Sequence, residues 1–397
     1  SALTVLIGSP GSPVAYLPHA FVAICLIFVM PTQPKRTNLL VANGAVTLYF
    51  LYCMFFLPCI GVADGMYIAR SISYLTIWMF LVFFGFTTNN TDYQRFVGLR
   101  VVFNFVLVGI SLYSVAWILN SNPETTAGGV TRFSTSTFSG NAAGRNALYG
   151  AIITTVFLSY SETRGWALVR FASLLAIFLT VMVIAVNKTS LIAYAFVAFL
   201  VFSRGLQRER KVLFVLVFLA MAVYIAFFTQ TTENMRALVT DEQSVSDIQD
   251  LTGRTNIWPI VIDMICQDYV RLLLGHGYGT ADLVLSERVL WADVGHAHNA
   301  VLNALLETGI IGAILLHFVL LRNVRDSLLY ARKNSELVQY HKIALFLSLA
   351  ILLRGITEGA YAQIGAVDMC LMVVLYGFYR SLERRRVGIQ GFRTRMT

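Results

Sequence analysis

Two histidines near a predicted helix start are the residues of this chain best suited to acid–base chemistry. His296 and His298 lie in the run Gly295-His296-Ala297-His298-Asn299, directly before a long apolar segment. An imidazole has an unperturbed pKa of about 6.5, so it can take a proton from a substrate at neutral pH and release it again. Asn299 is a residue type that caps helices.

Two other roles for this histidine pair stay open at the level of sequence. An interfacial histidine can simply cap a helix or reach towards the membrane surface, with no part in chemistry. A His-x-His pair is also a weak metal signal. No third ligand stands at a suitable spacing in the sequence, so we expect no metal site and no cofactor.

Three arginines are candidates for binding an anionic substrate. Arg254 begins an amphipathic stretch, while Arg132 and Arg145 belong to an earlier polar segment. A guanidinium suits a diphosphate because its planar fork donates two parallel hydrogen bonds and keeps its proton at neutral pH. The alternative for Arg254 is charge pairing with the acidic residues of its own segment.

Two groups of glycines predict a tight turn and a site of close helix packing. The pattern Gly275-x-Gly277-x-Gly279 is similar to a phosphate-binding turn, but no predicted strand precedes it, so we expect only a tight turn that returns the loop to the membrane. Gly309 and Gly312 lie on the apolar segment after the histidines, where the lack of a side chain lets a neighbouring helix pack closely.

The composition of the chain indicates that most of it lies in a lipid bilayer. Hydrophobic residues make up 57% of the 397 residues and charged residues only 13%, well below the usual quarter. The net charge of +9 therefore does not indicate a nucleic-acid partner. The five cysteines show no paired spacing, so no disulfide framework is expected.

Apolar windows predict eleven transmembrane helices: 14–31, 39–61, 72–88, 101–119, 146–160, 167–186, 189–203, 212–229, 299–321, 343–356 and 365–380.

Basic residues orient these spans. Most of the 30 lysines and arginines fall in alternate short loops and in the C-terminal tail, which places that side in the cytoplasm. Counting back puts residue 1 outside, so we expect residues 1–10 to be the outer end of a preceding twelfth helix; the alternative is an N-terminus that lies outside. The result is an all-α polytopic bundle, a single transmembrane domain over residues 1–397. It has a smaller outer loop at 120–145 and a large outer loop at 230–298 that contains short amphipathic helices.

The motif order resembles that of a known family. Arg254 in a Gly-Arg-Thr-x-x-Trp context, the Gly-x-Gly-x-Gly turn, and His298-Asn299 followed after nine residues by Gly309-x-x-Gly312 are similar to the signature of the O-antigen ligase and polymerase superfamily. These are bacterial inner-membrane glycosyltransferases with about a dozen helices and one large periplasmic loop. The His-Asn-x9-Gly-x-x-Gly spacing is the form associated with the ligase branch, and the polymerase branch shares much of it.

This resemblance implies a reaction and a set of roles. The donor is an O-antigen polysaccharide on undecaprenyl diphosphate, and the acceptor is the lipid A-core. His298 carries over as the catalytic histidine, and Arg254 and Arg132 carry over as the arginines that hold the diphosphate. Arg145 offers a further guanidinium, whereas His296 has no counterpart in the motif. The site would face the periplasm and work without a metal.

Two alternatives differ in what they predict. A polymerase would use undecaprenyl-diphosphate-linked repeat units as both donor and acceptor. A flippase without chemistry would show inverted repeats and helices broken at the midplane. The sequence shows no internal repeat, and its polar candidates gather on one side. Lys188 and Glu358 fall at the outer ends of their spans and could line one outer cavity, although Lys188 could equally reach the membrane surface.

Overall fold

The computed structural model is mostly helical, in agreement with the predicted all-α class. It describes residues 44–53, 57, 92–125, 131–134, 140–160, 164–185, 187–203, 254–286, 288, 296–332, 337–359, 368–369, 371–373 and 375–380. The predicted spans 14–31, 72–88 and 212–229 and the expected helix before residue 10 lie outside the described residues.

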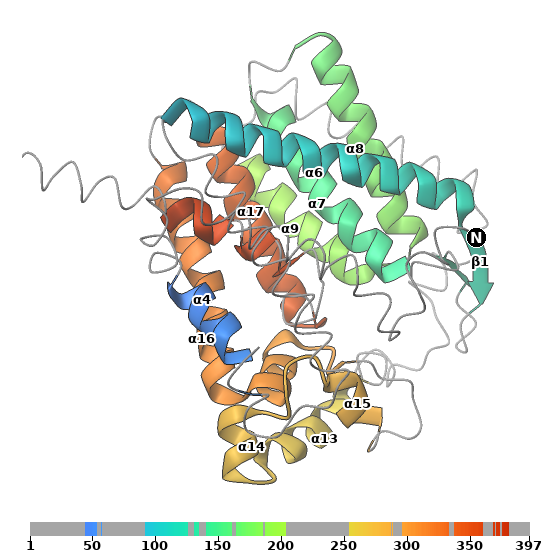
Figure 1. Ribbon diagram of the computed structural model, residues 1–397. Coiled ribbons are helices and arrows are strands. Elements are labelled where there is room, and N and C mark those ends of the chain that lie inside the picture. The colour runs from blue at the N-terminus through green and yellow to red at the C-terminus, as the bar shows by residue number, and fades with distance from the viewer. Residues whose placement is uncertain are drawn as a thin grey trace, which may run out of the picture. The chain divides into compact units, whose positions relative to one another are not determined.

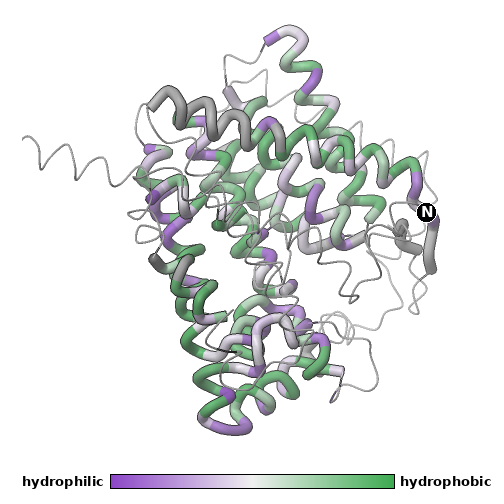
Figure 2. The backbone as a smooth tube through the Cα atoms, viewed as in Figure 1, coloured by the Kyte–Doolittle hydropathy of each residue, from purple (hydrophilic) through white to green (hydrophobic). Residues whose placement is uncertain are grey.

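Most predicted spans within the described ranges coincide with helices (Figure 1). These helices are α6 (Asp92–Asn120), α7 (Gly140–Ser159), α8 (Trp166–Ile184), α9 (Lys188–Ser203), α16 (Ala300–Ala331) and α17 (Val338–Gly355), and α4 (Gly44–Leu51) covers part of the 39–61 span. Against the eleven spans predicted, two of the described helices, α8 and α16, are long and apolar enough to cross a membrane (Figure 2).

The smaller outer loop contains a feature that we did not predict. Strands β1 (Asn122–Thr125) and β2 (Thr131–Ser134) pair antiparallel, with Glu124 opposite Arg132. Their residues show no apolar alternation, so no local pattern predicts these strands. The described part of the chain is therefore helical with one short hairpin.

The chain divides into two compact units, each built from segments far apart in sequence. The first unit comprises residues 1–95, 253–327 and 355–397, and the second comprises residues 96–252 and 328–354. The histidines, Arg254, Gly309 and Gly312 belong to the first unit. Arg132 and Arg145 belong to the second.

Helices α7, α8 and α9 pack together in the second unit. Gly150 of α7 lies against the ring of Phe178 in α8, where an added Cβ would meet that ring at 2.6 Å. The Thr155 and Tyr194 hydroxyls share a hydrogen bond of 2.8 Å between α7 and α9. Small and polar residues at these crossings are typical of helices that associate within a membrane.

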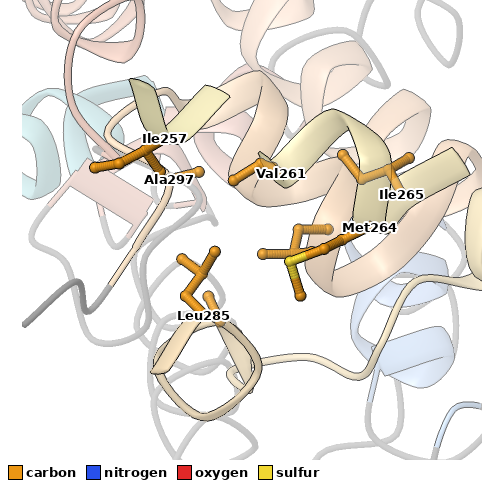
Figure 3. Close-up of a cluster of buried hydrophobic side chains, with 8 residues drawn as sticks. Ile257, Val261, Met264, Ile265, Leu285 and Ala297 are labelled. Carbon is orange, nitrogen blue, oxygen red and sulfur yellow. The ribbon is translucent and has the colours of Figure 1, made fainter. Parts of the chain in front are cut away.

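Three short helices of the large outer loop pack on the head of α16 in the first unit. They are α13 (Arg254–Cys266), α14 (Tyr269–Leu274) and α15 (Ala281–Ser286). Their shared core contains Ile257, Val261, Met264, Ile265, Ala281, Leu285, Ala297 and Leu306 (Figure 3). The amphipathic spacing that begins at Ile257 predicted this arrangement, and the short helices are confirmed.

Helix α16 is broken at Gly309. This residue has φ 60° and ψ −170°, which is outside the helical region and costs little only for glycine. A Cβ at Gly309 would meet the carbonyl oxygen of Leu273 at 2.2 Å, and one at Gly275 would meet the backbone of Glu307 at 2.4 Å. The predicted close approach of a helix at Gly309 is confirmed, and the partner is α14 of the outer loop. The break itself was not predicted.

The break releases backbone carbonyls that other groups then take up. The carbonyls of Leu306 and Glu307 accept hydrogen bonds from the backbone N–H groups of His276 (2.8 Å) and Gly277 (2.9 Å). The carbonyl of Thr308 accepts one from the Tyr52 hydroxyl (2.9 Å). The Gly-x-Gly-x-Gly segment is thus a turn, as predicted, and it docks by its backbone on α16.

Hydrogen bonds and ion pairs join helix ends that are predicted to lie on one side of the membrane. Asn299 at the start of α16 bonds the carbonyl of Ile356, and both positions are predicted to be outside. At the opposite end of α16, Asp326 pairs with Arg322 (3.2 Å) and with Arg380, in the region predicted to be cytoplasmic. The sides of the membrane on which these ends lie stay a prediction.

Replacing Gly309 with Ala tests the importance of the break. We expect a fall of roughly 5 °C or more in the melting temperature of the detergent-solubilised protein, because a Cβ meets the Leu273 carbonyl and the backbone lies in a glycine region. Gly109→Ala in α6 is the matched control, since no atom of the described residues lies within 4 Å of its added Cβ, and its melting temperature should stay level or rise. Equal melting temperatures for the two variants would contradict this account.

Candidate active site

The two candidate histidines lie side by side at the head of α16. Their ring centroids are 4.1 Å apart, and the rings are tilted by 41°. The His296 side chain is 19% exposed and that of His298 is 25% exposed, so both imidazoles are partly open to a ligand. Both histidines belong to the segment that links the outer loop to the first turn of the helix.

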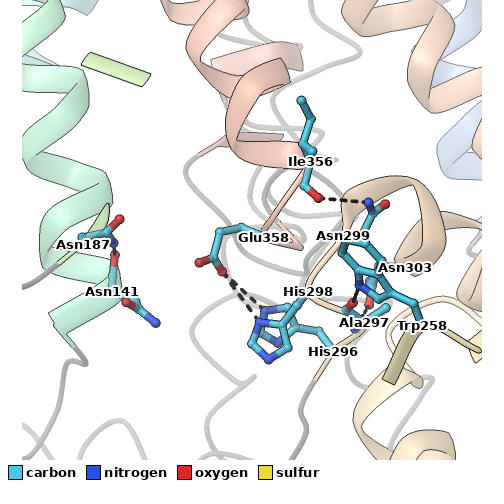
Figure 4. A network of polar contacts seen from close by, with 10 residues as sticks. All are labelled: Asn141, Asn187, Trp258, His296, Ala297, His298, Asn299, Asn303, Ile356 and Glu358. Carbon is cyan, nitrogen blue, oxygen red and sulfur yellow. Dashed lines mark hydrogen bonds and ion pairs between the residues drawn. The ribbon is translucent and has the colours of Figure 1, made fainter. Parts of the chain in front are cut away.

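The residue between the histidines is held at both of its backbone groups (Figure 4). The backbone N–H of Ala297 donates to Oδ1 of Asn303 at 3.1 Å. The carbonyl of Ala297 accepts from the indole Nε1 of Trp258 at 3.1 Å. Ala297 itself is fully buried. A peptide held on both sides cannot rotate freely, so the backbone positions of the two histidines are defined by α13 and α16 together.

Asn299 caps α16, as its residue type predicted. Its Oδ1 accepts hydrogen bonds from the backbone N–H groups of Val301 (2.9 Å) and Leu302 (3.0 Å). Its Nδ2 donates to the carbonyl of Ile356 at 3.0 Å, just beyond the end of α17. The same side chain therefore caps α16 with its oxygen and binds the segment after α17 with its nitrogen. It thereby holds that segment close to the histidines.

His298 has a left-handed backbone conformation. Its φ is 49°, which non-glycine residues seldom adopt and which costs about 1 kcal/mol or more. The hydrogen bonds of its two neighbours, Ala297 and Asn299, hold this conformation. Strain of this kind, maintained by the surrounding structure, is common where a side chain must point in one direction.

Glu358 is the third member of the cluster, at a place that no spacing in the sequence predicted. Its Oε2 lies 3.8 Å from Nε2 of His296 and 4.0 Å from Nδ1 of His298 (Figure 4). The residue is buried, with 8% of its surface exposed. We had considered Glu358 only as a charge in an outer cavity, because it lies sixty residues after His298 and no local spacing connects the two.

This arrangement corrects the expectation that no third metal ligand stands near the histidines. One ligand atom from each of His296, His298 and Glu358 lies within 4.8 Å of the others. Two imidazoles and one carboxylate are a donor set that suits zinc or a similar divalent ion. The chemistry of these residues thus fits either a metal or a carboxylate paired with two imidazoles.

The described residues place the three arginines on different elements. Arg254 is the first residue of α13, one helical turn before Trp258, and residues at this spacing share a helix face. Arg132 lies in β2, and Arg145 lies in the second turn of α7. Because Arg254 belongs to one unit and Arg132 and Arg145 to the other, their use of one cavity stays a prediction.

Glu307 is a further polar residue of this region that we did not single out. It is 4% exposed, and its carboxylate bonds the backbone at Gly279 and Ala281 and the side chain of Asn303. It therefore ties the glycine turn and the start of α15 to the residue that holds Ala297. The available signal was an acidic residue inside the predicted apolar span 299–321.

Comparison with known proteins finds a family model that matches part of the chain. Residues 172–317 match the family model described as O-antigen ligase, Wzy_C. No curated protein shows significant similarity to the chain. The matched segment contains most of α8, all of α9 and α13 to α15, and α16 up to residue 317. It therefore includes Arg254, the two histidines, Gly309 and Gly312. This match supports the membership of the chain in the O-antigen ligase superfamily that the motif spacing predicts.

Proposed function

We propose that this protein is an O-antigen ligase of the bacterial inner membrane. It transfers O-antigen polysaccharide from undecaprenyl diphosphate to the lipid A-core on the periplasmic side. The observation that carries this proposal is the placement of His298 at the capped head of α16, within the segment that matches the O-antigen ligase model. Family proteins of this kind are membrane proteins with glycosyltransferase-like activity, and the apolar helices of this chain agree with that.

His298 acts as the general base in the proposed reaction. A hydroxyl of the acceptor sugar attacks the anomeric carbon of the donor, and His298 withdraws the hydroxyl proton as the new carbon–oxygen bond forms. The bond from the anomeric carbon to the diphosphate breaks, and undecaprenyl diphosphate leaves with the bonding electrons. A positioned base of this type contributes about 10² to 10⁴ in rate, and a single displacement inverts the anomeric centre.

Arg254 stabilises the leaving diphosphate. Its position on α13 shares a helix face with Trp258, whose indole holds the peptide between the histidines. A guanidinium near that peptide would meet the negative charge that grows as the donor bond breaks. Arg132 and Arg145 are proposed to add donors from the second unit, because a diphosphate offers more oxygens than one guanidinium can bond.

The proposed reaction draws its energy from the phosphate ester of the donor, so it needs no nucleotide. Guanidinium groups can balance the charge of a diphosphate without a divalent ion. If His296, His298 and Glu358 did hold a metal, the ion would act as a Lewis acid on the substrate. The proposal assigns no step to it.

A transfer assay with purified protein tests the function. The protein in lipid nanodiscs is mixed with undecaprenyl-diphosphate-linked O-antigen and, in separate reactions, with lipid A-core or with a single lipid-linked repeat unit. A ligase extends lipid A-core, whereas a polymerase lengthens the glycan on undecaprenyl diphosphate. A flippase forms no new covalent product with either acceptor, and that result would overturn the proposal.

The two histidines should differ strongly in this assay. We expect His298→Ala to lower the transfer rate by at least about a hundredfold, because the helix cap and the left-handed backbone aim this side chain. His296→Ala should cost much less. Donor binding and membrane insertion, measured on the same samples, should stay at wild-type levels. If His296→Ala abolishes transfer and His298→Ala does not, the base is assigned to the wrong histidine.

Arginine-to-lysine replacements test the proposed diphosphate contacts. Arg254→Lys and Arg132→Lys should each lower the transfer rate by roughly tenfold or more, because an ammonium keeps the charge and loses the planar fork. Arg164→Lys is the matched control, since Arg164 is exposed and lies in a loop predicted to be cytoplasmic. Wild-type rates for both Arg254→Lys and Arg132→Lys would remove bidentate diphosphate binding from the mechanism.

A further inference from the structure

We propose that Glu358 is the positioning residue of the His298 base: its carboxylate keeps the imidazole proton on Nδ1 and leaves Nε2 free to accept the proton of the acceptor hydroxyl. This inference rests on the proposed function, since it assumes that His298 is the base. It assigns a role to a residue that lies outside the segment matched by the family model. It also specifies which nitrogen of His298 reacts.

The distances and the burial of Glu358 carry the assignment. Its Oε2 is 4.0 Å from Nδ1 of His298, close enough for a charge interaction and within a small rotation of a hydrogen bond. The Glu358 side chain is only 11% exposed, whereas that of His298 is 25% exposed. A buried carboxylate needs a proton donor or a cation beside it. An imidazole with its proton on Nδ1 supplies that donor and presents its other nitrogen elsewhere.

The fold sets this distance through Asn299. The Asn299 amide caps α16 directly after His298 and also bonds the carbonyl of Ile356, two residues before Glu358. The base and the acid are therefore tied to the same side chain. The Nδ1 atom of His298 is itself buried, so the more exposed part of the ring is left for the substrate.

His296 competes for the same carboxylate oxygen. Its Nε2 lies 3.8 Å from Oε2 of Glu358, slightly closer than His298. His296 presents a different nitrogen, however, and Ala297 separates its backbone from the helix cap. We infer that His296 shares the charge of Glu358, while the orientation that matters for transfer is that of His298.

A metal is the competing explanation for the same three residues. Bonds of 2.0–2.1 Å to a tetrahedral ion place neighbouring ligand atoms about 3.3 Å apart. The two carboxylate–imidazole separations, 3.8 and 4.0 Å, are longer than this. They are also longer than an N–H···O hydrogen bond of about 3.0 Å. A small rotation of the side chains would therefore complete either arrangement, and the experiment below includes the metal as an outcome.

With these roles for His298 and Glu358, the proton of the acceptor hydroxyl can be followed through each step. As the acceptor oxygen bonds the anomeric carbon, its proton moves to Nε2 of His298, which becomes an imidazolium with both nitrogens protonated. The positive charge then lies beside the carboxylate of Glu358, which stays ionised and stabilises it. After undecaprenyl diphosphate departs, Nε2 releases the proton to water.

A double-mutant cycle between Glu358 and His298 tests the inference. We expect Glu358→Gln to lower kcat at least about tenfold with the donor KM within about twofold, because orientation is lost and binding is kept. Glu358→Asp, which keeps the charge on a shorter side chain, should recover part of kcat. In the His298→Ala background, Glu358→Gln should have no further effect, since it acts only through that imidazole.

Several results would overturn the inference. A wild-type kcat for Glu358→Gln, alongside an inactive His298→Ala, would reject Glu358 and leave the proposed base in place. Equal losses from Glu358→Gln with and without His298 would show that the carboxylate acts elsewhere. If Glu358→Gln fails to insert into the membrane, the cycle is measured with Glu358→Asp, and the same comparison decides.

Two controls separate the remaining explanations. Asp263→Asn removes an exposed carboxylate of α13 and should leave kcat unchanged. Wild-type enzyme treated with a chelator should keep its rate, whereas a loss that zinc restores would make the cluster a metal site. An active His298→Ala enzyme would reject the proposed base itself, a result that differs from every outcome that concerns Glu358 alone.

Discussion

The carbonyl groups released by the break in α16 need new hydrogen-bond donors, and the arrangement of the first unit depends on how they are supplied. A buried carbonyl without a donor is costly, and more so where lipid replaces water. The donors are the backbone of the glycine turn and the Tyr52 hydroxyl. The turn lies between α14 and α15. Its hydrogen bonds to the carbonyls of α16 therefore also hold these loop helices on α16. The loop core around Val261 and Leu285 then completes the attachment.

The position of the histidines follows from this attachment. With α13 held against α16, the Trp258 indole reaches the carbonyl of Ala297 while Asn303 of α16 takes its N–H group. Glu307 connects the same Asn303 to the glycine turn. The break in the helix and the geometry of His298 are thus linked by a continuous set of hydrogen bonds. A site built on such a network needs few large side chains and little loop movement to hold one imidazole in place.

Burial divides the roles among the charged groups. The carboxylate of Glu358 is buried, and the two imidazoles beside it are partly exposed. With this arrangement the Glu358 carboxylate can interact with the charge of His296 and His298 without contacting the substrate. An interaction between charges is stronger where water is excluded, so a carboxylate placed behind the imidazoles has more effect on them than one at the surface would have.

Several features could be predicted from local patterns, because each depends on neighbours in the chain. The apolar windows located α6 to α9, α16 and α17, and the spacing at Ile257, Val261 and Met264 indicated the amphipathic helix α13. Asn299 was recognisable as a cap by its type and position. The motif from Arg254 to Gly312 indicated the superfamily that the family model supports. The hairpin β1–β2 was missed because its strands carry no alternating pattern.

The sequence by itself determined the helical class, the resemblance to the O-antigen ligase superfamily and the choice of His298 as candidate base, since hydropathy, residue type and spacing act over short distances along the chain. Only the tertiary structure decided that Glu358 lies beside His296 and His298, that Trp258 holds Ala297, and that α16 is broken where the loop docks. Trp258 and Ala297 are 39 positions apart, and Glu358 lies 62 and 60 positions after the two histidines. These contacts exist because α13 and the segment after α17 return to the head of α16, and no local pattern records where a segment returns.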